Sequence, residues 1–178
     1  MFSYCPKCGQ KYNNKTNQYE YKCTSCKFIL YNNPKPVVNG IILRPADNAF
    51  LLIQRAKAPF KNYWGLPGGF VSYNEDPGVA LRRELKEELG VESQVQKILG
   101  TFNEIYLNKG RKEEIYSTVT IVYLTRLLSK KNMIFSGEVG QADFFIIDSI
   151  PKNIAFKNQK KFLNKIFKEA LFKKQFLC

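Results

Sequence analysis

A glycine-rich run followed by an acidic stretch constrains the fold of this chain more than any other feature. The run Gly65–Gly69 allows backbone conformations and close approaches that side chains would forbid. Farther along, Asp76 suits a helix N-cap, a proline follows it, and Gly90 suits the residue that ends a helix. The sequence therefore predicts a loop, a short strand at residues 70–72 and a helix over about Pro77–Leu89.

The predicted helix has two different sides. Leucines recur every four residues along one side, at Leu81, Leu85 and Leu89, and can anchor the helix on a core. Glu84, Glu87 and Glu88 project from adjacent turns, and like charges this close destabilise a bare helix. Hard divalent cations such as Mg2+ or Mn2+ prefer oxygen donors. The residues alone leave two interpretations open, a carboxylate metal site or a solvated helix laced with ion pairs.

Four of the five cysteines form two CxxC pairs, Cys5-x2-Cys8 and Cys23-x2-Cys26. Two chelating pairs of thiolates are what a closed tetrahedral Zn2+ site requires. The segment around them is too short and polar to bury a core, so metal binding would supply its folding free energy. A redox dithiol or paired disulfides are the competing interpretations. We expect a structural zinc site here and an incidental free thiol at Cys178.

Composition narrows the chemistry that is available. The 178 residues include no histidine, which excludes Ser-His-Asp and Cys-His catalysis, HExxH zinc hydrolases and Cys2His2 fingers. Hydrophobic residues make up 44% of the chain, which favours a globular fold over a disordered one. The net charge of +13 favours phosphate-rich partners, although a solvated lysine-rich surface explains it equally well.

Two further observations concern location. The N-terminal sequence MFSYCPKCG lacks the apolar run of a signal peptide, and a secreted disulfide scaffold would spread its cysteines through the chain. No apolar stretch approaches the roughly 20 residues needed to span a bilayer. We therefore expect a reducing, cytoplasmic location and no membrane partner.

The pattern along the chain predicts three segments. Residues 1–30 are a zinc ribbon, residues 31–36 are a linker stiffened by two prolines, and residues 37–178 form the main domain. Short apolar runs predict strands in the main domain, at residues 37–43 and 50–54 as a hairpin, and at 94–107, 115–128 and 144–147, with a polar turn at 108–111.

A second helix is predicted near the C-terminal end, over about Asn158–Gln175. Apolar residues recur on one side of it at helical spacing, at Phe162, Leu163, Ile166, Phe167, Ala170 and Leu171. Lysines occupy much of the remainder. We expect an amphipathic helix packed on the sheet of the main domain.

The acidic stretch resembles the signature of the Nudix family. That signature is Gly, five residues, Glu, seven residues, Arg-Glu, an apolar residue, any residue, Glu-Glu, any residue, Gly and an apolar residue. Every position is satisfied, by Gly69, Glu75, Arg83, Glu84, Leu85, Glu87, Glu88, Gly90 and Val91. A chance match is on the order of one in a million at ordinary residue frequencies.

The resemblance extends to nearly the whole chain. Residues 63–70 and 54–56 are similar to the segments that flank the signature in the family. The four-cysteine ribbon together with residues 33–36 resembles the zinc-ribbon Nudix subgroup that includes NADH pyrophosphatases.

This resemblance implies a fold and an activity. The fold is α+β, an α/β/α sandwich around a mixed β-sheet, preceded by a small N-terminal zinc ribbon. The activity is divalent-metal-dependent hydrolysis of a diphosphate linkage in a nucleoside diphosphate derivative, NDP-X, to NMP and phosphorylated X. Mg2+ or Mn2+ is the implied catalytic cofactor and Zn2+ the structural one. Many relatives are dimers, so a homodimer is a further expectation.

The matched positions imply roles for individual residues. Glu84, Glu87 and Glu88 are the implied metal ligands and, with Arg83, the catalytic set. Arg83 would orient a neighbouring glutamate and Glu75 would support the geometry of loop and helix. The candidates for the general base are Glu87, Glu88 and Glu138. The candidates for substrate binding are Trp64, Gly68, Gly69, Phe70 and Glu138. Trp64, Phe70 and Tyr73 could stack a base or belong to the core.

The resemblance leaves the substrate open. NADH pyrophosphatases carry a Ser-Gln-Pro-Trp-Pro-Phe type array after the signature, and residues 100–106, Gly-Thr-Phe-Asn-Glu-Ile-Tyr, contain none. NADH or NAD, ADP-ribose, a dinucleoside polyphosphate, a nucleoside triphosphate and an NAD-capped RNA 5′ end are the candidates. A second functional class is a non-catalytic module that senses a nucleotide or binds RNA or protein. The intact glutamate set argues against that class.

Overall fold

The chain folds into two compact units. A computed structural model describes residues 2–12, 19–108, 113–128 and 133–173. The first unit is Met1–Lys35 with Ile105–Ser117, and the second is Pro36–Glu104 with Thr118–Cys178. The domain limits expected from the sequence stay a prediction.

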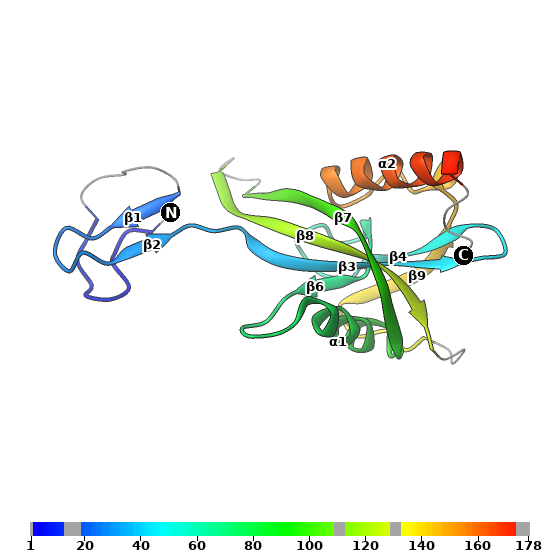
Figure 1. Cartoon of the computed structure of the whole chain (residues 1–178), viewed down its shortest axis with the longest axis horizontal. Helices are drawn as coiled ribbons and strands as arrows, with labels where there is room; N and C mark the ends of the chain where they lie inside the picture. Colours follow the sequence, from blue (N-terminus) through cyan, green and yellow to red (C-terminus); the bar gives the residue numbers. More distant parts are fainter. Residues whose placement is uncertain (1, 13–18, 109–112, 129–132, 174–178) are drawn as a thin grey trace. The chain divides into compact units, whose positions relative to one another are not determined.

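The first unit contains two similar cysteine turns. In each turn, the amide of the last residue donates to the carbonyl of the first cysteine, at 2.9 Å for Gly9 and 3.0 Å for Lys27. Both last residues have positive φ, 74° and 60°, so each turn ends in the left-handed conformation. The antiparallel strands β1 (Glu20–Lys22) and β2 (Ile29–Tyr31) flank the second turn (Figure 1). Local backbone geometry therefore presents the cysteines in pairs.

The second unit is built on a seven-stranded sheet in the order β5-β4-β3-β8-β7, with β6 paired to β3 and β9 paired to β4. The strands of this sheet are β3 (Lys35–Arg44), β4 (Ala49–Arg55), β5 (Trp64–Gly65), β6 (Gly68–Phe70), β7 (Ser93–Asn108), β8 (Glu113–Leu127) and β9 (Val139–Phe145). Lys35 and the parts of β7 and β8 within Ile105–Ser117 belong to the first unit. β3 and β4 form the predicted antiparallel hairpin. β3 and β8 run in the same direction (Figure 1), so the sheet is mixed, as predicted.

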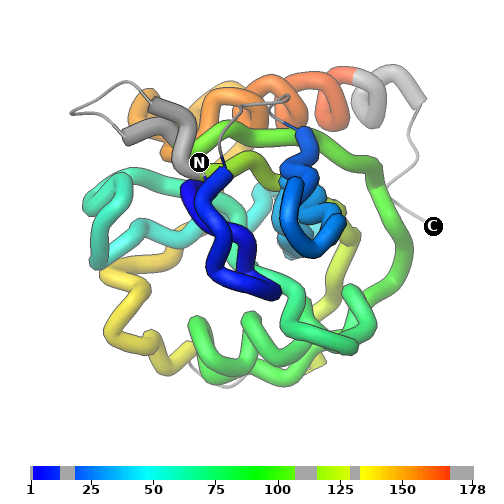
Figure 2. Tube along the Cα trace, turned by 90° about the vertical axis from the view of Figure 1, so that its left-hand side faces the viewer, coloured from blue at the N-terminus to red at the C-terminus, as the bar shows by residue number. Residues whose placement is uncertain are grey.

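Two helices, α1 (Pro77–Leu89) and α2 (Lys157–Lys173), cover opposite faces of this sheet (Figures 1 and 2). Side chains alternate between the faces along each strand. Val38 and Ile42 of β3 pack with the leucines of α1, whereas Ile41 packs with Phe162, Leu163 and Phe167 of α2. The predicted α/β/α sandwich is confirmed.

Both ends of α1 are fixed by the residues that the sequence indicated. The Asp76 carboxylate accepts hydrogen bonds from the amides of Gly78, at 2.8 Å, and Val79, at 3.1 Å. Gly90 ends the helix with φ 67°, and its amide donates to the Lys86 carbonyl at 3.0 Å. The helix therefore holds its acidic side in a defined rotation relative to the sheet.

Two strand predictions are corrected. The run Gly65–Gly69 is no loop: β5 ends and β6 begins within it, and β6 stops at Phe70, so the strand predicted at 70–72 lies two residues earlier. Glycines carry no apolar alternation, so their pairing with β3 has no sequence pattern. β9 starts at Val139, before the predicted 144. The sequence pattern missed this start because the exposed residues Gln141 and Asp143 are polar. A 3-10 turn, Ile147–Ser149, follows it.

Some predictions lie outside the described residues. The turn at 108–111 is described only at its first residue, and Gln175 is not described. Ala170 and Leu171 belong to α2, but their side chains are outside the description. Within the described part of the chain, no helix has the length and apolar character needed to cross a membrane.

Candidate active site

Arg83 of α1 ties the acidic side of the helix to the segment before it. Its Nε and Nη2 donate to the two Glu75 carboxylate oxygens, both at 2.9 Å, which makes a bidentate pair. Its Nη1 donates to Glu84 at 2.8 Å and to Glu87 at 3.3 Å, and Nη2 also donates to the Phe70 carbonyl at 3.0 Å. One guanidinium therefore holds three carboxylates and the end of β6.

Glu88 is held instead by the glycine segment, Gly65–Gly69. The Gly68 amide donates to Glu88 Oε2 at 2.8 Å. Gly68 has φ 134°, and a Cβ there would collide with the Val38 carbonyl oxygen, so the position requires glycine. A Cβ on Gly69 would lie 2.5 Å from the Glu84 carboxyl carbon. Both predicted glycines therefore let β6 approach the carboxylates of α1 closely.

The surroundings separate the pKa values of these carboxyl groups. The Arg83 guanidinium, helped by the Ser72 amide, lowers the pKa of Glu75 to about 2. Burial raises the pKa of Glu84 in spite of its contact with Arg83. Burial also raises the pKa of Glu88 to about 8, with the Gly68 amide opposing the rise. Glu84 and Glu88 therefore lie where a nearby cation would favour the ionised form.

The glutamates suit a hard divalent cation in their chemistry. They offer carboxylate oxygens, which Mg2+ and Mn2+ prefer, and Glu84 and Glu88 lack full solvation. They do not form a closed cage. Among the described residues, only the four cysteines bring three or more donor atoms within 4.8 Å of one another. Arg83 Nη1, between Glu84 and Glu87, neutralises part of the charge that a cation would otherwise screen.

The predicted aromatic residues have different environments. The Trp64 ring is 7% exposed and packs edge-on against Phe145, with ring centroids 4.9 Å apart. Its position matches the second of the two interpretations, a core residue. Phe70 is partly exposed, and Tyr73 is fully exposed.

Glu138 lies beside the C-terminal end of α1. Its neighbour in the loop, Ser136, donates its amide to the Glu88 carbonyl at 3.1 Å. The Glu138 carboxylate is exposed and pairs with Lys57 at 3.1 Å. Burial and the Gly68 amide have the largest effects on the pKa of Glu88. Among the smaller effects, the Arg55 charge lowers this pKa and the Glu138 charge raises it. The loop therefore adds a carboxylate near Glu88, and β4 adds one cation, Arg55, at its last residue.

Sequence reasoning missed two buried polar residues, Asn39 and Gln159. Their exposed fractions are 6% and 1%. Asn39 interrupts the apolar run of β3, and Gln159 precedes Phe162 and Leu163 by one helical turn on the apolar side of α2. A polar residue inside an apolar pattern was the signal that could have revealed both.

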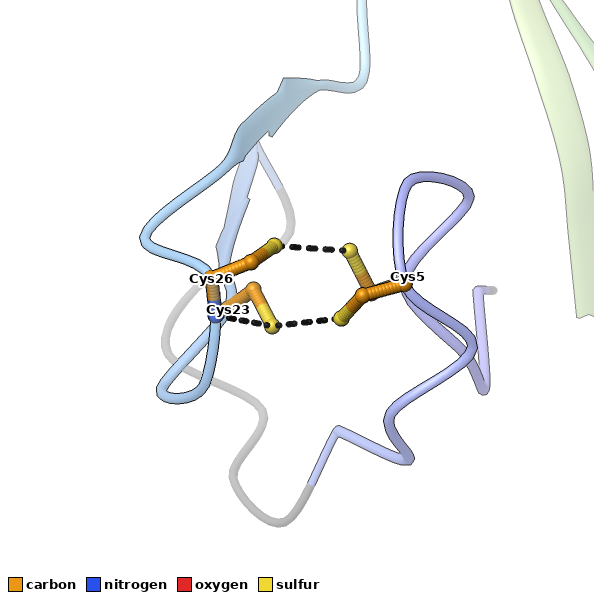
Figure 3. A group of neighbouring side chains, drawn as sticks. Cys5, Cys23 and Cys26 are labelled. Carbon is orange, nitrogen blue, oxygen red and sulfur yellow. Dashed lines mark hydrogen bonds between the residues drawn. The ribbon is translucent and has the colours of Figure 1, made fainter.

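The sulfurs of the four cysteines lie within 4.8 Å of one another in the first unit. Figure 3 labels three of these residues, Cys5, Cys23 and Cys26. Cys5 Sγ lies 3.7 Å from Cys26 Sγ, and Cys8 Sγ lies 3.6 Å from Cys23 Sγ. A disulfide requires about 2.0 Å. Sulfurs on a tetrahedron with Zn–S bonds of about 2.3 Å are about 3.8 Å apart, so the separations fit a zinc site.

The pKa values of the thiols support the same fit. Burial alone would raise the pKa of Cys5, but backbone amides and the other thiols lower it to about 6. The Gln10 amide favours the Cys8 thiolate, yet the neighbouring thiols raise its pKa to about 11. Four thiolates this close repel one another, and a divalent cation removes that conflict.

Comparison with known proteins identifies the family. The family model of the NUDIX domain matches residues 34–166, which is most of the chain. The chain belongs to the Nudix family. The predicted Nudix fold and the predicted enzyme class, a Nudix pyrophosphohydrolase, are thereby confirmed, and Nudix hydrolases use divalent metals.

Individual relatives agree with this assignment. The ADP-ribose pyrophosphatase of Methanocaldococcus jannaschii is 34% identical over 134 residues, 75% of this chain and 74% of that protein. The nucleoside triphosphatase NudI of Escherichia coli is 41% identical over 86 residues, and the match covers 44% of this chain and 58% of that protein. The crystal structure of a Nudix hydrolase from Nitrosomonas europaea has a TM-score of 0.74 at 25% identity, covering 97% of this chain and 94% of that one.

Glu75→Gln is expected to destabilise this Nudix chain near neutral pH and to lose that effect in acid. The folded-state pKa of Glu75 is lowered to about 2, so its stabilising contribution is present above about pH 4.5 and fades as the pH falls toward 2. We also expect roughly 10- to 100-fold lower activity, because Arg83 loses its bidentate partner.

Urea unfolding at pH 7 and at pH 3 measures this prediction. The gap between the urea midpoints of wild type and Glu75→Gln should narrow at pH 3. A gap of equal size at both pH values would show that the Arg83–Glu75 charge pair is not its source.

Proposed function

We propose that this chain hydrolyses the diphosphate bond of ADP-ribose or a closely related nucleoside diphosphate derivative, with AMP and a sugar phosphate as products. The observation that carries the proposal is the glutamate set organised by Arg83, in a chain similar to an ADP-ribose pyrophosphatase over 134 residues. NADH and NAD are the second candidates, because the cysteine ribbon resembles that of NADH pyrophosphatases. The missing aromatic array at residues 100–106 places them second.

In this proposal Glu84 and Glu88, assisted by Glu87, hold Mg2+ or Mn2+. The bound cation would screen the phosphate charge, polarise the diphosphate and activate water. Arg83 restrains Glu84 and Glu87, and the Gly68 amide fixes Glu88. The net charge of +13 attracts a polyanionic substrate toward this acidic site.

A carboxylate must also accept the proton of the attacking water, while the bridging oxygen leaves with one phosphate. Glu87 and Glu138 are the candidates that solvent reaches, with side chains 60% and 68% exposed. Glu88 is the less exposed candidate, and its hydrogen bond from Gly68 suits a ligand that stays in place.

We further propose a structural Zn2+ on Cys5, Cys8, Cys23 and Cys26, in a ribbon formed by residues 1–30 and followed by a linker at 31–36. The sulfur separations of 3.6 and 3.7 Å support this assignment. Four thiolates fill a tetrahedral site and leave no open position for a substrate water.

A substrate panel tests the proposed hydrolysis. ADP-ribose, NADH, NAD, a dinucleoside polyphosphate, a nucleoside triphosphate and an NAD-capped RNA are incubated with Mg2+ or Mn2+, and released nucleotides are separated by chromatography. We expect AMP and ribose 5-phosphate from ADP-ribose, with a kcat/KM at least about 10-fold above the other substrates, since one misfitted group costs a factor of this size.

Two variants accompany the panel. Glu87→Gln should lower turnover on the order of 100-fold or more, whereas Glu92→Gln, which removes an exposed glutamate paired with Lys86, should not change it. Binding of ADP-ribose without turnover of any compound by wild type would contradict the proposal and favour a nucleotide-sensing module.

A further inference from the structure

A buried amide network joins α2 to the segment between β5 and β6. Gln159 Oε1 accepts a hydrogen bond from the Leu66 amide at 3.1 Å, and Gln159 Nε2 donates to Asn39 Oδ1 at 3.3 Å. Asn39 Nδ2 in turn donates to the Pro67 carbonyl at 3.4 Å. Two side chains from distant parts of the chain therefore hold two consecutive residues of this segment.

The network is built into a tight space. A Cβ on Gly65 would lie 3.3 Å from Gln159 Oε1, so the glycine leaves room for the amide to reach the backbone. The Gly40 amide also donates to the Pro67 carbonyl, at 3.0 Å. The Gln159 side chain, which extends from α2, therefore has little space beside β5, and its amide is held to these partners.

The start of α2 is itself fixed to the sheet. The Asn158 amide donates to the Glu104 carboxylate at 2.9 Å, and Asn158 Nδ2 donates to the Asn103 carbonyl at 2.7 Å. The backbone before the helix pairs with β5, where the Ala155 amide donates to the Trp64 carbonyl at 2.8 Å. β7 and β5 therefore fix the position from which Gln159 reaches the glycine segment.

Gly68, the residue directly after Pro67, donates its amide to Glu88 at 2.8 Å. We infer that Gln159 is a positioning residue that, through Asn39 and the Leu66–Gly68 backbone, fixes the Gly68 amide and so the Glu88 carboxylate. The inference rests on the proposed role of Glu88 as a metal ligand. It gives the C-terminal helix, which carries none of the carboxylates, a part in the geometry of the site.

Packing alone does not account for a glutamine at this position. An apolar side chain beside Phe162 and Leu163 would pack there without the cost of burying an amide. The glutamine is tolerated because both ends of its amide have partners, and such networks favour one arrangement of the backbone.

The test compares three variants of the full chain. Gln159→Met fills a similar space but removes the donor and the acceptor. Gln159→Glu keeps an acceptor for the Leu66 amide. Phe167→Leu is the matched control, because Phe167 lies on the same helix about two turns after Gln159 and stacks on Phe50 of β4, with ring centroids 4.5 Å apart.

Two readouts separate positioning from stability. The first is hydrogen exchange of the Gly68 amide, measured by NMR in metal-free protein, and the second is Mn2+ affinity without substrate. Gln159→Met should accelerate Gly68 exchange at least about 10-fold relative to β3 amides and weaken Mn2+ binding about 10-fold. Gln159→Glu should recover part of both. Phe167→Leu should lower the melting temperature and change neither.

Equal Gly68 exchange and Mn2+ affinity in Gln159→Met and Phe167→Leu would overturn the inference. If Gln159→Met does not fold, Asn39→Ser removes the side-chain amide that bonds to the Pro67 carbonyl, at the cost of a small loss of volume, and is judged by the same readouts. Both readouts are taken without substrate, so they decide the inference even if ADP-ribose is not hydrolysed.

Discussion

Glu88→Gln is expected to lower kcat/KM for the diphosphate substrate on the order of 1000-fold while the protein remains folded. The side-chain carbonyl of a glutamine can still accept the Gly68 amide that now donates to Glu88 at 2.8 Å. The substitution therefore removes a negative charge and changes the shape of the site little. If the charge of Glu88 holds a divalent cation, Mn2+ affinity falls together with the rate.

The same substitution should stabilise the metal-free protein at alkaline pH. Glu88 has a folded-state pKa raised from 4.5 to about 8, mainly by burial. Folded protein therefore holds a proton that unfolded protein has lost, and wild-type stability falls as the pH rises from about 4.5 to 8. The Glu88→Gln protein does not lose stability in this way. In wild type, the loss of unfolding free energy amounts to about 2 to 4 kcal/mol after allowance for partial exposure of the carboxyl group.

Kinetics with Mg2+ and urea unfolding in a chelator at pH 5 and pH 8 measure the two effects. Glu92→Gln is the control, because it removes an exposed carboxylate beyond the end of the same helix. A Glu88→Gln protein that is slow but no more stable at pH 8 would contradict the burial of an ionisable carboxyl. One that keeps wild-type activity would remove Glu88 from the site.

The helix α1 could be predicted because its information is local. Asp76 and Gly90 satisfy the ends of the helix by themselves, and the leucine spacing depends only on helical periodicity. The roles suggested for Arg83 and Glu75 came from the family signature, and their bidentate pair is present in the structure. These features need no knowledge of the rest of the chain.

Other features depend on partners that are distant in the sequence. Gly68 and Gly69 pair with Asn39 and Val38 in β3, and the pairing leaves no apolar pattern in the glycines. Gln159 acts on a segment 93 residues before it in the chain. A pattern within one segment cannot predict such contacts, although a polar residue on an apolar face can mark where to look.

Removal of zinc should unfold the first unit and leave the second folded. Among its described residues, only Cys5, Tyr21 and Cys23 are buried, so this unit has almost no core of its own. Zn2+ binding supplies about 10 to 16 kcal/mol in comparable small domains. Cys23→Ser, which replaces a buried thiol of the proposed site, is therefore expected to expose residues 1–35 to protease within minutes, whereas wild type resists.

Trp64 makes the second half of this prediction measurable. It is the only tryptophan of the chain and lies in the core of the second unit, so its fluorescence reports unfolding of that unit alone. The urea midpoint of Trp64 fluorescence should be the same in wild type and Cys23→Ser. Cys178→Ser, which removes the fifth cysteine, controls for thiol number and should retain about one equivalent of zinc. Protease resistance in Cys23→Ser, or clearly less than one equivalent of zinc in fresh wild type, would refute the site, because a unit with so small a core needs the metal to stay folded.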